Sequence, residues 1–284
     1  MEYLTDQAID QFITSALNED VGDGDHSSLA AISQGTTNIA QLIVKDDGIL
    51  AGVEVALRIF KKVDADLKVE VFIKDGDRVS SGDIAFKVKG SARSILTAER
   101  LVLNCMQRMS GIATLTKSMS SQLRGYKTKL LDTRKTTPNF RLMEKWAVKI
   151  GGGENHRFAL YDMVMLKDNH IDFAGGIPEA IRATKKYLNK KGLKLKIEIE
   201  TRTLAEVGQV MKEGGVDIIM LDNMMPSTMR QAVALIGNDY ITEASGGITE
   251  ENLREVAECN VDYISVGALT HSVKSLDMSL KAKN

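Results

Sequence analysis

Six short apolar runs in the second half of the sequence each end at a polar residue or at a turn that contains glycine. We call the residue at the end of each run its corner residue. These residues are Arg134, Lys167, Glu200, Asp222, Glu243 and Val266. They lie about 21 to 33 positions apart, which is the length of one strand–helix unit. In repeated strand–helix units the carboxyl ends of parallel strands meet at one edge or rim. We therefore expect cationic and carboxylate side chains from distant parts of the chain to meet in one site.

The charge is divided along this part of the chain. Residues 129–170 hold eight lysines and arginines against five acids, together with His156 and His170, whereas residues 196–222 hold three bases against six acids. Cations bind anionic substrates directly, and carboxylate oxygens at strand ends suit a magnesium ion that bridges phosphates. Each residue taken alone is explained equally well by a surface ion pair. Together they favour a site that binds a polyanion both directly and through a divalent cation.

Two corners that contain glycine lie near the end of the sequence. Ser245, Gly246 and Gly247 follow the fifth apolar run and precede a predicted helix, and Gly267 with Ala268 ends the sixth run. Backbone N–H groups at such corners bind phosphate, and the last two strands of an α/β barrel often supply this pair. Either corner alone is more often an ordinary turn. The two together predict a phosphate site.

The elements that position these side chains follow from the pattern of hydrophobic residues. The six runs are residues 130–135, 163–169, 195–201, 218–223, 241–247 and 264–269. Repeated strand–helix units of one hand form either a parallel barrel or an open doubly wound sheet. Because no Gly-x-Gly-x-x-Gly follows the first run, we favour an α/β barrel. With six strands rather than eight, this barrel is either incomplete or has strands that the pattern does not reveal.

The third run indicates which way its charges point. From residue 193 to 200, leucine and isoleucine alternate with lysine and glutamate, so apolar and charged side chains occupy opposite faces of a strand. Helices cover the outside of a barrel, so we expect the charged face of this run, Lys194, Lys196, Glu198 and Glu200, to point into its interior. Glu200, nearer the carboxyl end of the strand, would reach the mouth.

The first hundred residues predict a small α+β domain. A helical period runs from Thr5 to Leu17. Short extended runs follow at residues 39–44, 48–53, 69–73 and 84–88. A long helical pattern from Ile95 to Leu123 then predicts a helix that links this domain to the barrel.

Composition and charge argue against several classes of protein. Lysine and arginine number 37 and aspartate and glutamate 38, so a net charge of −1 provides no general attraction for nucleic acid or an anionic membrane. The longest apolar run, Ala232 to Ile236, is far shorter than a membrane span, and the N-terminal residues do not resemble a secretory signal. Cys105 and Cys259 are too few for a disulfide framework or a zinc site. We expect a cytoplasmic protein with small-molecule substrates.

Strings along nearly the whole chain resemble, in order, those of the quinolinate phosphoribosyltransferases. They are AERLVLN (98–104), LDTRKTTP (131–138), GGGENHR (151–157), LYDMVMLKDNH (160–170), IEIE (197–200), IIMLDN (218–223), EASGGI (243–248) and ISVGALTHS (264–272). The resemblance implies an incomplete parallel α/β barrel with an N-terminal α+β sandwich-like domain. It implies that residues 1–112 form the N-terminal domain, residues 113–270 the barrel, and residues 271–284 a segment that packs back on the N-terminal domain. It also implies a homodimer with shared active sites, or a larger assembly of such dimers.

The resemblance further implies that the protein is a pentosyltransferase of de novo NAD biosynthesis. Quinolinate and phosphoribosyl pyrophosphate, with magnesium, would give nicotinate mononucleotide, pyrophosphate and CO2. Quinolinate carries two carboxylates, which planar guanidinium groups bind better than the point charge of a lysine does. Arg100, Arg134 and Arg157 agree with such a substrate.

The family pattern implies how the acceptor is bound. Arg134, His156, Arg157 and Lys167 would contact the quinolinate carboxylates or the substrate phosphates. Arg100 would enter the site from the partner subunit. Lys167 would also take part in catalysis.

The same pattern implies how the phosphoribosyl donor is bound. Lys135 would contact the pyrophosphate, and Glu200 and Asp222 would hold the magnesium-bound ribose pyrophosphate, directly or through water and substrate. These three residues would also be catalytic. The 5-phosphate would lie between residues 245–247 and the corner of Val266, Gly267 and Ala268.

Three other functions agree with parts of this pattern. A relative with the same fold could act on another anion, Lys167 could be the nucleophile of a Schiff-base lyase, and the barrel could bind phosphate without catalysis. The arginines favour a dicarboxylate substrate. The presence of both Glu200 and Asp222 favours an enzyme over a mere binding protein.

Overall fold

The computed structural model describes residues 3–283, and the chain divides into two compact units. One unit contains the residues up to 118, residues 135–152 and the residues from 269 onward; the other contains residues 119–134 and 153–268. The domain boundaries expected at residues 112 and 270 stay predictions.

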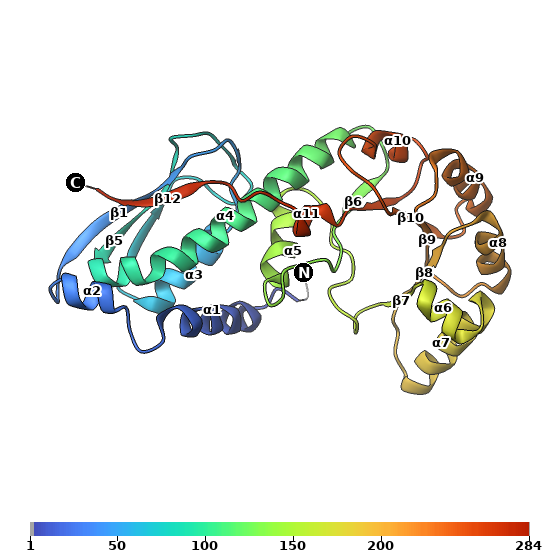
Figure 1. Ribbon diagram of the computed structural model, residues 1–284, viewed down its shortest axis with the longest axis horizontal. Helices are drawn as coiled ribbons and strands as arrows, with labels where there is room; N and C mark the ends of the chain where they lie inside the picture. The colour runs from blue at the N-terminus through green and yellow to red at the C-terminus, as the bar shows by residue number, and fades with distance from the viewer. Residues whose placement is uncertain (1–2, 284) are drawn as a thin grey trace. The chain divides into compact units, whose positions relative to one another are not determined.

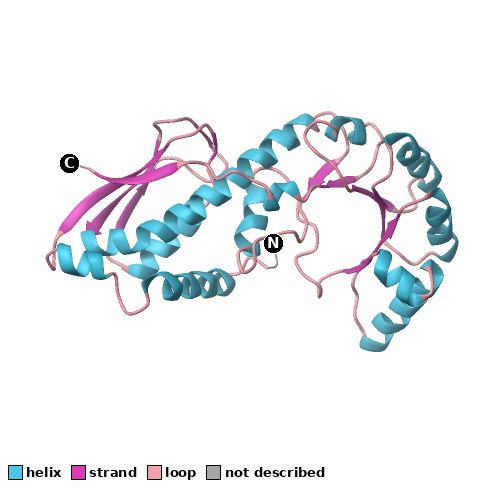
Figure 2. Cartoon of the chain, viewed as in Figure 1, coloured by secondary structure: helices cyan, strands magenta, loops and turns pink. Residues whose placement is uncertain are grey.

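The first unit is built on an antiparallel sheet (Figure 2). Its strands, in spatial order, are β12 (Met278–Ala282), β1 (Thr37–Val44), β5 (Ile84–Ser91) and β3 (Lys68–Val71). A second, small sheet pairs β2 (Gly48–Ile49) with β4 (Arg78–Val79). Ala40, Leu42 and Val44 are buried and alternate with more exposed residues, so β1 buries one of its faces. The expected α+β architecture of this part of the chain is confirmed.

The first unit also contains helices. They are α1 (Asp6–Val21), α2 (His26–Ala31), α3 (Val53–Val63), α4 (Ala92–Gln122, in this unit up to residue 118), α5 (Arg141–Ile150) and most of α11 (Ala268–His271). α1 begins where the hydroxyl of Thr5 accepts the N–H of Ala8 (3.1 Å). The long helix predicted from Ile95 to Leu123 is confirmed as α4, which buries Cys105 and Met109 on one face.

One predicted extended run folds differently. Residues 48–53 supply only the two residues of β2, because α3 already begins at Val53. Gly52 adopts a left-handed conformation (φ 97°), and the carboxylate of Asp75 accepts the N–H groups of Val53 (2.8 Å) and Glu54 (3.2 Å). This helix start is capped by a residue more than twenty positions away, so no local pattern reveals it.

The second unit is a curved sheet of parallel strands (Figures 1 and 2). Its order is β6 (Lys129–Leu131), β11 (Tyr263–Ser265), β10 (Ile241–Ser245), β9 (Ile218–Asp222), β8 (Ile197–Thr201) and β7 (Val164–Leu166). Every pairing between these strands is parallel. Within residues 3–283, β6 and β7 do not pair with each other, and a single bridge from Leu131 to Glu154 extends the sheet beyond β6. The predicted six-stranded, incomplete barrel is confirmed.

Helices cover the convex side of this sheet (Figure 2). They are α6 (Asp168–Ala174), α7 (Ile177–Lys191), α8 (Leu204–Glu213), α9 (Pro226–Ile236) and α10 (Leu253–Ala257). An open doubly wound sheet would carry helices on both faces, so the barrel interpretation is the correct one. Glu198 and Glu243 converge on one imidazole from β8 and β10, which places the charged face of β8 on the concave side as predicted. In the described part of the chain no helix combines the length and hydropathy of a membrane span.

A close approach in the first unit requires a glycine inside α4. A Cβ atom at Gly111 would lie 2.2 Å from the carbonyl oxygen of Lys274. The segment that leads to β12 crosses the helix here, and the N–H of Leu276 donates to the carbonyl of Gln107 (3.0 Å). The chain can therefore return to pair with β1 only because Gly111 has no side chain.

Replacing this glycine should destabilise the protein. Gly111→Ala forces the crossing segment away from α4, and we expect a loss of about 1–3 kcal/mol, the usual cost of overpacking. Gly208→Ala is the matched control, because Gly208 lies in α8 with open space around its Cα. That change should leave stability unchanged or raise it by about 0.5–1 kcal/mol through helix propensity. Urea unfolding measures both; equal stability of the two variants would contradict the account.

Candidate active site

The mouth of the second unit begins with an ion pair between neighbouring strand ends. Lys167 follows β7, and its ammonium group contacts the carboxylate of Glu200 on β8. The N–H of Asp168 also approaches Glu200 (3.4 Å), and the imidazole of His170 accepts the N–H of Lys167 (3.0 Å). Two residues predicted for the site, Lys167 and Glu200, are therefore brought together, and the start of α6 holds the lysine in place.

Asp222 and the glycine corner meet at the next two strand ends. The side-chain amide of Asn223 donates to Asp222 (2.8 Å), and its backbone N–H donates to the carbonyl of Ser245 (2.9 Å). A Cβ atom at Gly246 would lie 2.3 Å from the Asn223 side chain, and Gly246 has φ 89°. Asn223, which itself adopts φ 53°, joins β9 to β10 and was not predicted as a site residue. Its signal in the sequence is an asparagine at a strand end, a residue that tolerates this conformation.

One backbone N–H group of the last corner already donates a hydrogen bond within the barrel. The N–H of Val266 donates to the carbonyl of Leu131 (3.0 Å), so it supports the β11–β6 pairing. Gly267 follows, and α11 begins at Ala268. A phosphate at this corner would therefore be bound by N–H groups after Val266, not by that of Val266 itself.

Two guanidinium groups lie half-buried near these strand ends without full pairing. The Nε atoms of Arg134 and Arg157 are buried and have no hydrogen-bond partner within residues 3–283. Arg157 donates from Nη1 to the carbonyl of Met163 (3.2 Å). Burial, followed by the charge of Arg134, lowers the pKa of Arg157. Two like charges with unpaired donors in a partly dry environment form a site for an anion that can accept several hydrogen bonds.

A buried aspartate sets the backbone that carries one of these arginines. Asp132, which is fully buried, accepts the side-chain amide of Asn155 (2.6 Å) and the N–H of His156 (2.9 Å). Because His156 and Arg157 are consecutive, this carboxylate holds the 155–157 loop against the end of β6. Asp132 was not predicted as a site residue, although it belongs to the LDTRKTTP string.

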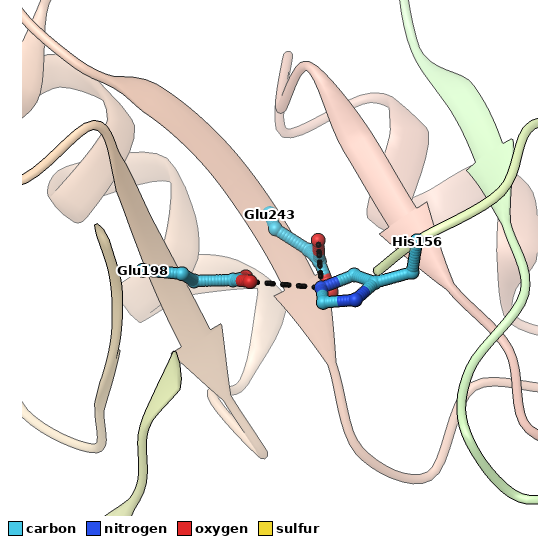
Figure 3. A group of neighbouring side chains, drawn as sticks. All are labelled: His156, Glu198 and Glu243. Atoms are coloured by element: carbon cyan, nitrogen blue, oxygen red, sulfur yellow. Dashed lines mark hydrogen bonds and ion pairs between the residues drawn. The ribbon is translucent and has the colours of Figure 1, made fainter. Parts of the chain in front are cut away.

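His156 points into the barrel, where it meets two buried acids (Figure 3). Its Nε2 atom lies 2.8 Å from Glu198 and 3.4 Å from Glu243. Burial opposes a charged imidazole, but the contacts with these two acids raise the pKa of His156. Burial, then the charge of Glu243, raises the pKa of Glu198 to about 7. The strand alternation pointed to an inward Glu198, but its pairing with His156 was not predicted.

Lys135 and Arg100 belong to the first unit. Lys135 is exposed, and its carbonyl accepts the hydroxyl of Thr270 (2.8 Å). The side chain of Arg100 is 71% exposed on α4 and pairs with the adjacent Glu99 (3.2 Å). An exposed arginine of this kind is available to a ligand or to another subunit.

A buried ion pair supports the turn that follows Lys135. Glu144, fully buried on α5, accepts the backbone N–H (3.0 Å) and the hydroxyl (2.9 Å) of Thr137. Arg108 on α4 donates two hydrogen bonds to the same carboxylate (3.0 and 2.9 Å) and also binds the carbonyl of Thr270. The two backbone segments around Lys135 are therefore tied to α4 and α5.

The carboxylates of Glu200 and Asp222 have the donor chemistry that magnesium requires. Mg²⁺ is usually bound through one or two carboxylates together with substrate phosphates, not by a cage of protein ligands. Within residues 3–283, the group that brings three ligand atoms within 4.8 Å of one another is His156, Glu198 and Glu243. Glu200 and Asp222, at the ends of adjacent strands, fit a magnesium ion that is completed by substrate oxygens.

Both parts of the chain match the domains of one known protein family. Residues 25–110 match the quinolinate phosphoribosyl transferase N-terminal domain, and residues 112–281 match the C-terminal domain of the same family. Together these matches cover both units.

Individual relatives agree with this result. The chain is 48% identical over 281 residues to the mitochondrial quinolinate phosphoribosyltransferase [decarboxylating] 2a of Nicotiana tabacum, covering 94% of this chain and 80% of the relative. It is 42% identical over 262 residues to the probable nicotinate-nucleotide pyrophosphorylase [carboxylating] of Bacillus subtilis, covering 92% and 89%. The crystal structure of NadC from Streptococcus pyogenes superposes with a TM-score of 0.91 at 42% identity over 99% of both chains. The chain therefore belongs to the quinolinate phosphoribosyltransferase family.

Proposed function

We propose that this protein transfers the phosphoribosyl group of phosphoribosyl pyrophosphate to the ring nitrogen of quinolinate. The products are nicotinate mononucleotide, pyrophosphate and CO2, which is a step of de novo NAD biosynthesis. The observation that carries the proposal is a pair of half-buried guanidinium groups, Arg134 and Arg157, whose Nε donors have no partner among residues 3–283. They lie on the unit that also bears Lys167, Glu200 and Asp222. A planar dicarboxylate satisfies such donors better than a single phosphate does.

The acceptor is bound through its carboxylates. Arg157 and Arg134 take the two carboxylates, and the negative charge of the ligand offsets the burial and the charge of Arg134, which lower the pKa of Arg157. Quinolinate is thereby held with its ring nitrogen directed at the donor, which removes much of the entropic cost of bringing two substrates together.

Displacement of pyrophosphate develops charge at two places. Positive charge grows on the ribose ring and faces the carboxylates of Glu200 and Asp222. Negative charge grows on the leaving pyrophosphate, which Lys135 and Lys167 stabilise. Lys167 is already neutralised in part by Glu200, so the pair can respond to substrate without leaving an isolated charge.

Magnesium is part of the proposal. Glu200 and Asp222 would hold the ion together with oxygens of the donor. When bound, magnesium neutralises the pyrophosphate and so improves it as a leaving group. Backbone N–H groups of Gly246, Gly247, Gly267 and Ala268 would bind the 5-phosphate beside them.

Decarboxylation follows from the first step. Once the ring nitrogen carries the ribosyl group, the ring is cationic and accepts the electron pair of the breaking carbon–carbon bond. The carboxylate next to the nitrogen leaves as CO2, and a proton then adds to the ring carbon. The chemistry therefore needs no organic cofactor.

A Schiff-base lyase is the alternative that uses the same lysine. An ammonium group paired with a carboxylate is a poor nucleophile, so the ion pair of Lys167 with Glu200 favours electrostatic contact over imine formation. Borohydride trapping of a substrate on Lys167 would favour the lyase instead.

The active form in this proposal is a homodimer, or a larger assembly of dimers, in the cytoplasm. Arg100 is exposed on α4 and would complete the site of the partner subunit. The relatives named above include a protein named as mitochondrial, so the cytoplasmic location is tested separately, by fractionation of the source cells.

The product assay tests the proposed reaction. Mixing the protein with phosphoribosyl pyrophosphate, magnesium and quinolinate labelled in the carboxyl next to nitrogen should release labelled CO2 together with an equal amount of nicotinate mononucleotide. Removing magnesium with a chelator should abolish turnover, and added magnesium should restore it. Absence of nicotinate mononucleotide from folded protein under these conditions would refute the reaction.

Removing one guanidinium should affect one substrate selectively. Arg157→Ala removes one of the two guanidinium groups that bind the carboxylates. It should weaken quinolinate binding about a hundredfold, whereas phosphoribosyl pyrophosphate binding largely survives. Arg182→Ala is the matched control, because Arg182 forms ion pairs on the outer helix α7. Titration calorimetry measures both affinities; equal loss of both in Arg157→Ala would show that the arginine is misassigned.

Mixed subunits test the shared site. Arg100→Ala and Lys167→Ala should each be inactive, but a hybrid dimer retains one intact site. Equal mixing with full subunit exchange should restore about a quarter of the wild-type activity. Size-exclusion chromatography and mass spectrometry of tagged subunits confirm the exchange, and no recovery after proven exchange would count against Arg100 acting across the dimer.

A further inference from the structure

A group of three side chains lies one step inside the barrel from the mouth (Figure 3). Glu198 precedes Glu200 by two positions on β8, and Glu243 precedes Ser245 by two positions on β10. His156 reaches between them, and the exposed fractions of the three side chains are 7% for His156, 0% for Glu198 and 1% for Glu243. Such burial of two acids is costly unless they are hydrogen-bonded, so their arrangement calls for a physical role.

The hydrogen bonds of the imidazole define its tautomer. Nδ1 accepts the backbone N–H of Arg157 (2.8 Å), so this nitrogen presents a lone pair. Nε2 faces the carboxylate of Glu198 (2.8 Å), so this nitrogen carries the proton. A second proton, on Nδ1, would face the N–H of Arg157. The geometry therefore favours the singly protonated ring, with its proton on Nε2.

This chain of contacts ends at the backbone of a substrate-binding residue. The N–H of His156 is held by Asp132 (2.9 Å), and the N–H of Arg157 is held by His156 itself. Within residues 3–283 the guanidinium of Arg157, in contrast, donates to the carbonyl of Met163 (3.2 Å), and its Nε has no hydrogen-bond partner. The backbone of Arg157 is therefore fixed, while its guanidinium group keeps a donor for an anion. This combination suits a residue that binds a substrate.

We propose that Glu198, backed by Glu243, is a positioning residue that holds His156 with its proton on Nε2, so that Nδ1 anchors the backbone of Arg157 for binding the dicarboxylate. This inference rests on the proposed function. It assigns a role to two acids that belong to neither the mouth nor the magnesium pair. It also gives His156 a role below the substrate, where its ring supports the backbone of Arg157.

A metal ion at the same three groups is the competing explanation. The ligand atoms lie close enough for one, and both oxygens of Glu243 and one of Glu198 have no hydrogen-bond partner within the described residues. Metal-bound histidine, however, usually donates its other ring N–H to an acceptor. Here the other nitrogen faces a donor, the N–H of Arg157, which favours a proton over a metal at Nε2.

Nitrogen-15 NMR of histidine-labelled protein tests the tautomer directly. The chain has four histidines, so the spectrum is simple, and the His156→Asn variant assigns the signal. Near neutral pH we expect a protonated Nε2 and an unprotonated Nδ1 at His156. Protonation of Nδ1, or a stoichiometric metal in the purified protein that is lost in His156→Asn, would overturn the proposal. This readout needs no substrate, so it is independent of the proposed reaction.

Variants of Glu198 then test the link to the substrate. Glu198→Met removes the acceptor at similar volume, and we expect the His156 tautomer to become mixed and quinolinate to bind about ten- to a hundredfold more weakly. Phosphoribosyl pyrophosphate affinity should change by less than about threefold. Glu198→Gln and Glu243→Gln keep an oxygen near Nε2 and should retain most of the affinity and the wild-type tautomer.

The control variant is Met220→Leu. Met220 is buried on β9, between the strands of the two acids, so this change repacks the same interior without altering a hydrogen bond. Equal loss of both substrates in a folded Glu198→Met, or failure of Glu198→Gln to retain quinolinate affinity, would contradict positioning through an acceptor. If Glu198→Met does not fold, the two glutamine variants and the wild-type spectrum decide. Normal NMR with no quinolinate binding in the wild type would refute the proposed function alone.

Discussion

The partial burial of two guanidinium groups, those of Arg134 and Arg157, is the constraint on which the site depends. Burial lowers the pKa of Arg157, and the charge of Arg134 acts in the same direction. The surrounding acids Glu198, Asp162 and Glu200 offset this in part. In the described part of the chain the buried Nε of each arginine has no hydrogen-bond partner, and the dianionic substrate proposed above would supply one. Burial and unmet hydrogen bonding are therefore the two features on which the proposed binding of an anion with several acceptors rests.

The parallel barrel allows one strand to serve two purposes. Side chains two residues apart on a strand share a face, so β8 presents Glu200 at the mouth and Glu198 one step inside. The outer acid pairs with Lys167, and the inner one holds His156. β10 repeats the arrangement with Ser245 and Glu243. Groups at the mouth and the groups one step inside it therefore come from the same rigid elements, which limits how far either can move.

The predictions from the sequence succeeded where the signal was local. Alternation in residues 193–200 shows which acids face inward, and strand-end spacing shows that Lys167 and Glu200 meet, as their ion pair confirms. The glycine at 246 is explained by a left-handed conformation and by its contact with Asn223. Local rules failed at residues 48–53, because the cap of α3 comes from Asp75, and they missed Asn223 because its contacts cross between two strands.

The sequence by itself determined the fold class, the family resemblance and the corner residues, because hydrophobic period and strand-end position depend on near neighbours along the chain. The tertiary structure alone decided which side chains support which. That Glu198 and Glu243 converge on His156, and that Glu144 and Arg108 secure the turn after Lys135, follows from sheet curvature and helix packing between residues far apart in sequence. No local pattern carries that information, because the distance between two distant side chains is set only when the whole unit closes around its core.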